Sequence, residues 1–362
     1  AVTWLFLPSI WGYQLSTHQT LLELHNLWVD VTLVASEFEW DKDFDKKCPY
    51  KILRKWLSDY KSCMKQMLYV NKLYKSWDYD FVILMWHYTE TAYWLLCNFL
   101  SFQPILLAAW TRLRFPASKW KLLLWKIILW NCYLHSKYII SISKQTKQQI
   151  IEDCGVNENN FTIIPRPIDC NIWWIIEDKI ENKIFTILTV SRFENWKNIK
   201  WVLDIISNLV KKGINIKYKI IWDWKEKLNI IRRIKQLWIK NNVELLWEIQ
   251  HNKLPIEYRN ADLFIFISKY EETFWRVYVE SFSQWTPVIW FSLWWPIEII
   301  DDWINWFLFN EWDIDKIVDK IVYLINNKKI LVELWNNGRK KFEEIYSSEK
   351  VWKRFLDTLK KI

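Results

Sequence analysis

Short apolar runs alternate with amphipathic segments along most of the chain. Runs that predict strands lie at 2–7, 29–36, 80–85, 161–169, 185–190, 217–223, 243–249, 262–268 and 287–291. Segments with helical period lie between them, at 14–26, 110–134, 199–211 and 225–237, and helices are expected throughout 313–362. Strands separated by helices at this spacing are typical of parallel sheets joined by βαβ crossovers. The pattern therefore predicts an α/β protein built from two doubly wound, Rossmann-like halves.

The irregular polar segment 168–182 separates the two halves. A length of 362 residues also favours two domains of roughly 150–200 residues each. We expect an N-terminal domain at 1–170, a C-terminal domain at 171–347 and a final helix at 348–362.

The composition is unusual in two residue types. The chain has 30 Trp and only 4 Gly, whereas ordinary proteins contain about 7% Gly. The tryptophans stand at turns and helix ends, for example Trp28, Trp222, Trp224 and Trp238, where a glycine is the usual residue. An aromatic core or ligand surface would instead follow the period of helices or strands.

We favour the hypothesis that most of these tryptophans are misread glycines. Some lineages read the codon UGA as glycine, and a translation table that reads it as tryptophan would produce this pattern. The excess of Lys, Ile and Asn suits an AT-rich gene, in which UGA is common. Restoring every position would give 34 Gly, about 9% of the chain, which is an ordinary content.

Charge and cysteine content narrow the function classes only slightly. The formal net charge is +9, which suits phosphorylated ligands or an anionic membrane surface; codon bias toward Lys is an equally good explanation, and we expect no nucleic-acid partner. The six Cys show no metal-binding spacing, so we expect reduced thiols and no metal site. Without a signal peptide or an apolar run of 18 residues, the sequence predicts a cytoplasmic protein.

Two basic amphipathic runs leave a membrane association open. They lie at 51–76 and 110–134 and mix Lys and Arg with apolar residues. The second is typical either of an ordinary domain helix with a solvated basic face, which we favour, or of a helix on the inner face of the membrane.

The stretch from Lys269 to Trp295 contains more candidate site residues than any other part of the sequence. Glu272 and Glu280 have seven residues between them. On a helix their separation is about 12 Å, which is too long for the carboxylate pair of a glycosidase, about 5–5.5 or 6.5–9.5 Å. Carboxylates so placed are better suited to hold sugar or ribose hydroxyls, although two solvated helix carboxylates are an equally good interpretation.

Three residues after Glu272 form a candidate phosphate-binding helix start. The backbone N–H groups of Thr273, Phe274 and Trp275 would face a phosphate, provided that position 275 is small. In the first half, the pair Trp11–Gly12 would do the same if Trp11 is a misread glycine, which alone is weak support.

Three further candidate residues lie just past strand ends, where doubly wound sheets bind ligands. Arg192 and Lys197 follow the strand at 185–190 and suit a diphosphate, since Arg offers a planar fork and Lys a point charge. Two solvated loop cations are an equal alternative. His87 follows the strand at 80–85, and a structural role for this histidine is the more common outcome.

Several motifs in 185–310 resemble the donor-binding domain of retaining glycosyltransferases of family 4, which have the GT-B fold. SRFENWKNI resembles the family's strand-end Arg and Lys motif, and IIWDWKEK its I-G-x-G turn. EETFWRVYVESFSQWTPVI resembles E-G-F-G-x-x-x-x-E-A-x-A-x-G-x-P-V-I, and WWPIEIIDDWINWFLF resembles G-G-x-x-E-I-I-x-D-G-x-N-G-F-L. Tryptophans stand at family glycines at positions 222, 224, 238, 275, 285, 294, 295, 303 and 306.

The resemblance is weaker over 1–170. PSIWG resembles the family's P-x-x-G-G loop, and PRPID resembles its P-N-G-V-D exit, from which Arg166–Pro167 departs. The family's fold implies that the helix at 348–362 crosses back onto the N-terminal domain.

The resemblance also implies roles for the candidate residues. Arg192 and Lys197 would hold the leaving diphosphate, and Glu280 would bind the ribose. Glu272 and His87 would lie near the donor sugar, and Glu298 would contact the nucleotide side. The implied reaction transfers a sugar from UDP or GDP to a glycan, lipid or lipid-linked acceptor, with retention of configuration and without a required metal.

Two other functions stay open at this stage. A nucleotide-sugar epimerase or phosphorylase of the same fold would need further acid–base residues in the N-terminal domain, where only His87 is a candidate. If the indoles are real, Trp275 and Trp294 would fill the phosphate site, and the chain would be an inactive, membrane-associated binding protein.

Overall fold

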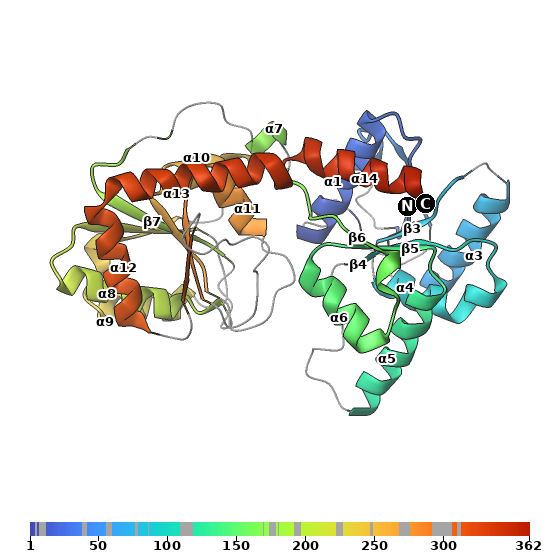
Figure 1. Ribbon diagram of the computed structural model, residues 1–362, viewed down its shortest axis with the longest axis horizontal. Helices are drawn as coiled ribbons and strands as arrows, with labels where there is room; N and C mark the ends of the chain where they lie inside the picture. Colours follow the sequence, from blue (N-terminus) through green and yellow to red (C-terminus); the bar gives the residue numbers. More distant parts are fainter. Residues whose placement is uncertain are drawn as a thin grey trace. The chain divides into compact units, whose positions relative to one another are not determined.

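A computed structural model gives the fold. The structure describes residues 1–3, 6, 12–37, 42–55, 60–76, 79–85, 87–108, 119–168, 170–173, 179, 181–191, 197–221, 227–246, 249–267, 276–291, 306–309 and 313–362. The chain divides into two compact units (Figure 1): unit 1 comprises Ala1–Pro167 with Val351–Ile362, and unit 2 comprises Ile168–Lys350.

Unit 1 is built on parallel strands. The strands are β1 (Thr32–Ala35), β2 (Lys51–Arg54), β3 (Ile83–Leu84), β4 (Ile105–Ala108), β5 (Tyr138–Ser141) and β6 (Phe161–Ile163). β1 pairs with β2, and β3 to β6 pair in sequence order. Val2 bridges both Val34 and Leu84, so the first segment lies between β1 and β3. The resulting order is β2-β1-Val2-β3-β4-β5-β6, and the direction of winding reverses at Val2.

Helices cover both faces of this sheet. They are α1 (Gly12–Asn26), α2 (Lys42–Asp45), α3 (Tyr60–Ser76), α4 (His87–Leu96), α5 (Lys119–Leu134), α6 (Lys144–Cys154) and the returning α14 (Ser348–Lys361), with short 3₁₀ turns η1 (Cys97–Phe99) and η3 (Glu158–Asn160). Val351, Trp352 and Phe355 of α14 pack into the same apolar core as Phe6 and Leu33. The last helix therefore belongs to the core of unit 1.

Unit 2 contains a single six-stranded parallel sheet. Its strands are β7 (Phe185–Val190), β8 (Ile216–Ile221), β9 (Val243–Leu246), β10 (Leu263–Ile265), β11 (Val288–Phe291) and β12 (Trp306–Phe309). They lie in the order β12-β11-β10-β7-β8-β9. Numbered from the first strand, this is the 3-2-1-4-5-6 order of a Rossmann fold. The winding reverses between β7 and β10.

The helices of unit 2 are α7 (Cys170–Trp173), α8 (Ile199–Lys211), α9 (Lys227–Gln236), α10 (Leu254–Arg259), α11 (Arg276–Ser283), α12 (Ile314–Asn326) and α13 (Lys328–Lys341). Shorter turns are η5 (Lys240–Asn242), η6 (His251–Lys253) and the π turn η7 (Phe342–Tyr346).

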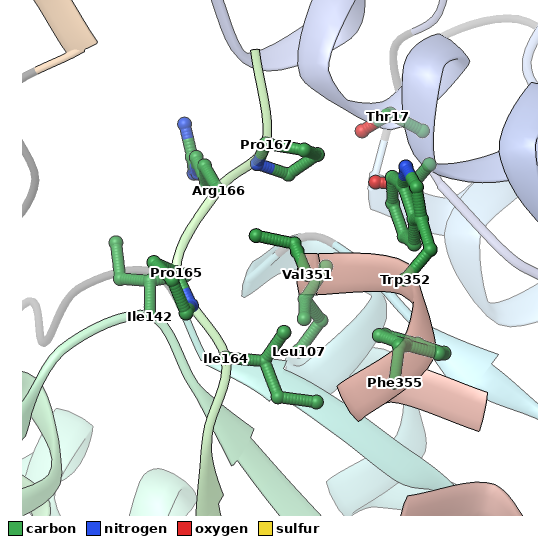
Figure 2. A pocket seen from close by; sticks show the side chains of 11 residues that line it. Thr17, Leu107, Ile142, Ile164, Pro165, Arg166, Pro167, Val351, Trp352 and Phe355 are labelled. Carbon is green, nitrogen blue, oxygen red and sulfur yellow. The ribbon is translucent and has the colours of Figure 1, made fainter. Parts of the chain in front are cut away.

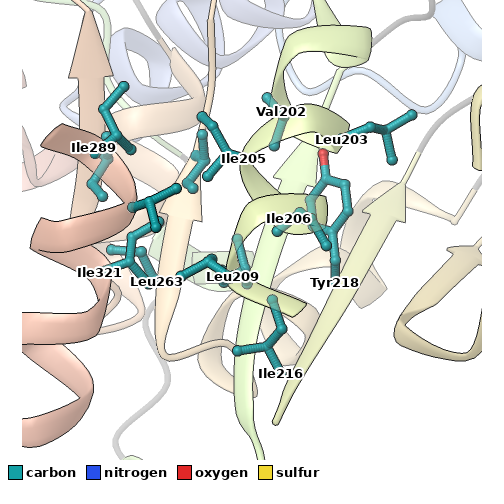
Figure 3. Close-up of a cluster of buried hydrophobic side chains, with 14 of the residues drawn as sticks. Val202, Leu203, Ile205, Ile206, Leu209, Ile216, Tyr218, Leu263, Ile289 and Ile321 are labelled. Carbon is teal, nitrogen blue, oxygen red and sulfur yellow. The ribbon is translucent and has the colours of Figure 1, made fainter. Parts of the chain in front are cut away.

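The sequence of α8 explains its place in this unit. Its apolar residues recur every three or four positions, which gives one helix face. Val202, Leu203, Ile206 and Leu209 are fully buried (Figure 3), where they face Tyr218 of the sheet. Burying each such side chain stabilises the fold by about 1.5–3 kcal/mol. The hydrophobic effect therefore fixes this helix against the sheet.

The segment after unit 1 is fastened to unit 2 by buried polar groups. The Lys179 Nζ donates to the carbonyl oxygens of Ala261 and Trp285, at 2.6 and 2.7 Å. The Asn182 side chain donates to the Asn260 carbonyl and to the Asp262 carboxylate. Burial lowers the pKa of Lys179 to about 7. The polar segment predicted between the two halves is thus held at the amino-terminal edge of this sheet.

One turn geometry recurs at helix ends. After α8, the Gly213 N–H bonds to the Val210 carbonyl and the next N–H to the Leu209 carbonyl, and Gly213 has φ 76°. This is a Schellman motif, in which the residue past the helix end is left-handed. The same pair of bonds follows α1, α9 and α11, where the left-handed residue is Trp28, Trp238 or Trp285.

The three tryptophans have φ of 65°, 59° and 54° in that order. This conformation costs a residue with a Cβ about 1–2 kcal/mol of conformational free energy, a cost that glycine does not have. Trp28 and Trp238 are 97% and 92% exposed, so burial of their side chains contributes little stabilisation to offset this cost. These turns therefore have the geometry of glycine turns.

Candidate functional site

The reversal of strand order in unit 2 marks its ligand site. Crossovers from β7 and β10 run to opposite sides of the sheet, which leaves a crevice at the carboxyl ends of these two strands. β7 and β10 are direct neighbours, with Ile187 beside Leu263 and Leu188 beside Phe264. Residues that follow either strand therefore converge on one point.

Lys197 lies at this point. It follows β7 and precedes α8, and its Nζ is 4.6 Å from the centre of the Phe266 ring, which follows β10. The contact is a cation–π interaction, and it holds the ammonium group over the ends of both strands. A cation in this position suits the phosphates of a nucleotide. Its predicted partner Arg192 lies outside the described residues.

Glu280 is the buried carboxylate of α11. It is only 4% exposed, and its Oε1 accepts a hydrogen bond of 2.9 Å from the Arg276 Nε, one helical turn earlier. The Tyr258 hydroxyl donates to Oε2 at 3.2 Å. The His251 Nε2 lies 3.9 Å from Oε1, which is beyond hydrogen-bonding distance.

These neighbours determine the charge state of Glu280. Burial raises the pKa of this carboxyl group, but His251 and the Arg276 guanidinium lower it by more, so the pKa lies below its ordinary value. Glu280 is therefore ionised at neutral pH. A carboxylate has about four acceptor positions, and the described residues occupy two of them, which leaves positions that suit a hydroxyl group of a ligand.

Sequence reasoning did not find Arg276, His251 or Tyr258. The four-residue spacing of Arg276 and Glu280 is a signal that could have found the first, because such residues face each other on a helix. Tyr258 is 22 residues from Glu280 in the chain, and its sequence context has no motif. Burial beside Glu280 raises the pKa of the Tyr258 hydroxyl, so it stays a hydrogen-bond donor.

Several predicted site residues lie outside the described part of the chain. They are Glu272, Thr273, Phe274, Trp275 and Glu298, together with Arg192. Helix α11 is described from Arg276 onward, which places its first described turn directly after this segment.

Two predicted residues fall at the corresponding point of unit 1. Gly12 begins α1, and His87 begins α4 directly after β3. The winding of this sheet reverses at Val2, which bridges β1 and β3. Both helices therefore start where a doubly wound sheet binds its ligand.

A small apolar pocket lies at the carboxyl ends of β4 to β6 (Figure 2). The side chains that line it are Thr17, Thr20, Leu107, Ile142, Ile164, Pro165, Arg166, Pro167, Val351, Trp352 and Phe355. The lining joins the sheet, α1, the exit segment and α14 of unit 1. The proline-flanked Arg166, which departs from the family's exit pattern, lies in this lining.

The described residues hold no group of three or more His, Cys, Asp and Glu arranged for a metal ion. Five cysteines, Cys48, Cys63, Cys97, Cys132 and Cys154, form no disulfide bonds. Within the same part of the chain, none of the helices has the length and apolar character needed to cross a bilayer.

Comparisons with known proteins agree with this geometry. The family profile described as "Glycosyltransferase Family 4" matches residues 12–172, and that described as "Glycosyl transferases group 1" matches residues 174–341. The capsular polysaccharide biosynthesis glycosyltransferase CapM of Staphylococcus aureus is 25% identical over 341 residues, which are 90% of this chain and 88% of CapM.

Solved structures share the whole fold. The complex of HepE from Anabaena with UDP superposes with a TM-score of 0.79 at 14% identity, covering 100% of both chains. The lipopolysaccharide outer core galactosyltransferase WaaB has a TM-score of 0.75 at 16% identity, covering 100% of this chain and 99% of its own. The chain is a glycosyltransferase of the GT-B fold.

The predicted fold class of this glycosyltransferase is confirmed. Both Rossmann-like units are present, and the last helix returns to the N-terminal one. In its C-terminal sheet, Lys197 follows β7, and Glu280 lies in the helix that connects β10 and β11.

We expect Glu280→Gln to lower the free energy of unfolding at pH 7 by about 1–3 kcal/mol, because it removes the buried charge that pairs with Arg276. The folded pKa of Glu280 is depressed, so its stabilisation is present above the ordinary value of 4.5 and is lost as the pH falls through the folded value. The difference between the two proteins should therefore shrink in acid. Urea unfolding across a pH series measures it.

Glu333→Gln is the matched control, since Glu333 is exposed on α13. Its effect should stay within about 0.5 kcal/mol at every pH. An unchanged stability of Glu280→Gln at pH 7, or an equal difference at all pH values, would contradict the assigned charge state.

Proposed function

We propose that this glycosyltransferase moves a sugar from a UDP-sugar to a glycan acceptor of a surface polysaccharide, with retention of anomeric configuration. The observation that carries the proposal is the pair Lys197 and Glu280 beside the strand reversal of unit 2. The bound UDP or UDP-glucose in structures of HepE supports the choice of donor. The name of CapM supports the acceptor class.

In this proposal the cations hold the leaving group. Lys197, with Arg192, binds the diphosphate and stabilises the negative charge that develops on it as the sugar departs. Glu280 accepts hydrogen bonds from the ribose hydroxyls, with its orientation fixed by Arg276 and Tyr258. GDP-sugars, named as an alternative from sequence, would use the same diphosphate contacts.

The remaining predicted residues contact the donor sugar, the nucleotide or its phosphates. Glu272 contacts the donor sugar near its anomeric carbon, and Glu298 contacts the nucleotide side. The N–H groups at 273–275 and at Gly12 face the phosphates. His87 lies near the donor sugar, and the acceptor attacks the same face that the diphosphate leaves. We expect this reaction without a bound metal ion.

Lys197→Met should lower kcat/KM for UDP-sugar by about 10²–10³, because a contact to the developing negative charge of the diphosphate is lost. Lys200→Met, on the exposed side of α8, is the matched control and should remain close to the wild type. UDP release with and without a glycan acceptor measures the rate. NMR of the first product measures its configuration.

Two results would overturn the proposal. The first is no release of UDP from any UDP-sugar in the protein isolated from its source and in a recombinant chain with glycine at 275, 294 and 295. The second is a product whose anomeric configuration is opposite to that of the donor. An equal loss of rate in Lys197→Met and Lys200→Met would remove Lys197 from the site.

We further propose that most of the tryptophans are glycines in the native protein. The left-handed turns at Trp28, Trp238 and Trp285 support this, because they share their hydrogen bonds with the turn at Gly213. The buried indoles of Trp173, Trp335 and Trp352 have no hydrogen-bond acceptor for Nε1 among the described residues, although buried Trp N–H groups usually find one. The donor site needs glycine at 275, 294 and 295 for the phosphates to approach the backbone.

Peptide mass spectrometry of the protein isolated from its source is the test. We expect glycine in the peptides that contain positions 28, 238 and 285, since only glycine adopts their backbone without strain. Peptides with Gly155 and Gly213 serve as internal controls for the reading of glycine. Tryptophan at all three positions would exclude the proposal.

A further inference from the structure

The outer face of α5 is apolar. Six side chains on this helix are between 47% and 82% exposed: Trp120, Leu123, Leu124, Ile127, Trp130 and Leu134. Their spacing of three and four residues places them in one row along the helix. The row is about 20 Å long. Leu123, Leu124, Ile127 and Leu134 form it without any contribution from a tryptophan.

This face is not the one that packs on the protein. The opposite side of α5 buries Ile128, Leu129, Cys132 and Tyr133 in unit 1. Helices α4 and α6 both pack against α5 (Figure 1), and the side chains of the row remain exposed beside them. A helix on a protein surface normally has a polar outer face. An apolar row of this size marks an interaction surface.

The charge on α5 itself has one sign, because its charged residues are Lys119, Lys121 and Lys126. The acidic residues of the two neighbouring helices are the buried Glu90 of α4, and Glu152 and Asp153 in the last turn of α6. Lys126 is exposed on α5, and Lys144 is exposed at the start of the neighbouring α6. A cationic border around an apolar row is the pattern of a helix that lies in the headgroup region of an anionic bilayer.

We propose that the outer face of α5 binds the surface of an anionic membrane, with its apolar row at the level of the acyl chains and Lys126 among the headgroups. A second copy of this chain fits the face less well, because pairing two such faces would bring like charges together. The docking goes beyond the transfer reaction, since it requires neither donor nor acceptor.

The full chain is tested by co-sedimentation with vesicles of phosphatidylcholine, alone or mixed in equal parts with phosphatidylglycerol. We expect binding to the mixed vesicles that weakens with salt. The double variant Leu123→Ser with Ile127→Ser should bind about tenfold more weakly, because two apolar side chains no longer insert. Lys126→Glu should weaken binding to the mixed vesicles by about tenfold.

Leu228→Ser is the matched control, since Leu228 is 74% exposed on α9 of unit 2. It should bind as the wild type does. All variants change exposed side chains, and an unchanged melting temperature and UDP release confirm that they fold. Absence of binding to the mixed vesicles, or equal binding of the α5 variants and the wild type, would overturn the proposal. So would a dimer, seen by sedimentation without lipid, that the α5 variants abolish.

Discussion

The reversal of strand order between β7 and β10 is the constraint on which the site depends. In a parallel sheet every strand ends on the same edge, and only at a reversal do the connections leave a crevice there. Lys197 and Phe266 follow these two strands and touch. Glu280 is held by Arg276 and Tyr258 in the helix between β10 and β11. A different strand order would separate these groups, whatever their chemistry.

Much of this fold could be predicted because its helices and strands carry strong apolar patterns. Helix α8 has the predicted bounds, 199–211, since its buried face repeats every three or four residues. Strands β2 and β4 were not predicted. β2 is largely exposed or half-buried and lies in a run dominated by the amphipathic helix α3, so its four residues carry no alternation of their own. β4 lies just before the basic run at 110–134, which contains α5, and no separate strand was predicted there.

The candidate site was only partly predictable. Lys197 and Glu280 stand in motifs with fixed spacing, so both could be singled out from the family resemblance. Tyr258 and His251 could not be found, because their contact with Glu280 exists only after α10 and α11 pack together. The turns at the tryptophans, by contrast, could be predicted from the sequence, because these residues stand where a glycine usually ends a helix. The left-handed backbone at Trp28 and Trp238 has the geometry that such turns require.

Photo-crosslinking with an azido derivative of UDP-glucose tests the central claim most directly, namely that the donor binds at the β7–β10 reversal of this GT-B glycosyltransferase. We predict that the label, located by peptide mass spectrometry, lies in the segments that follow these strands, residues 191–200 and 266–280, and that free UDP removes it. A label confined to unit 1, or one that UDP does not displace, would contradict the account.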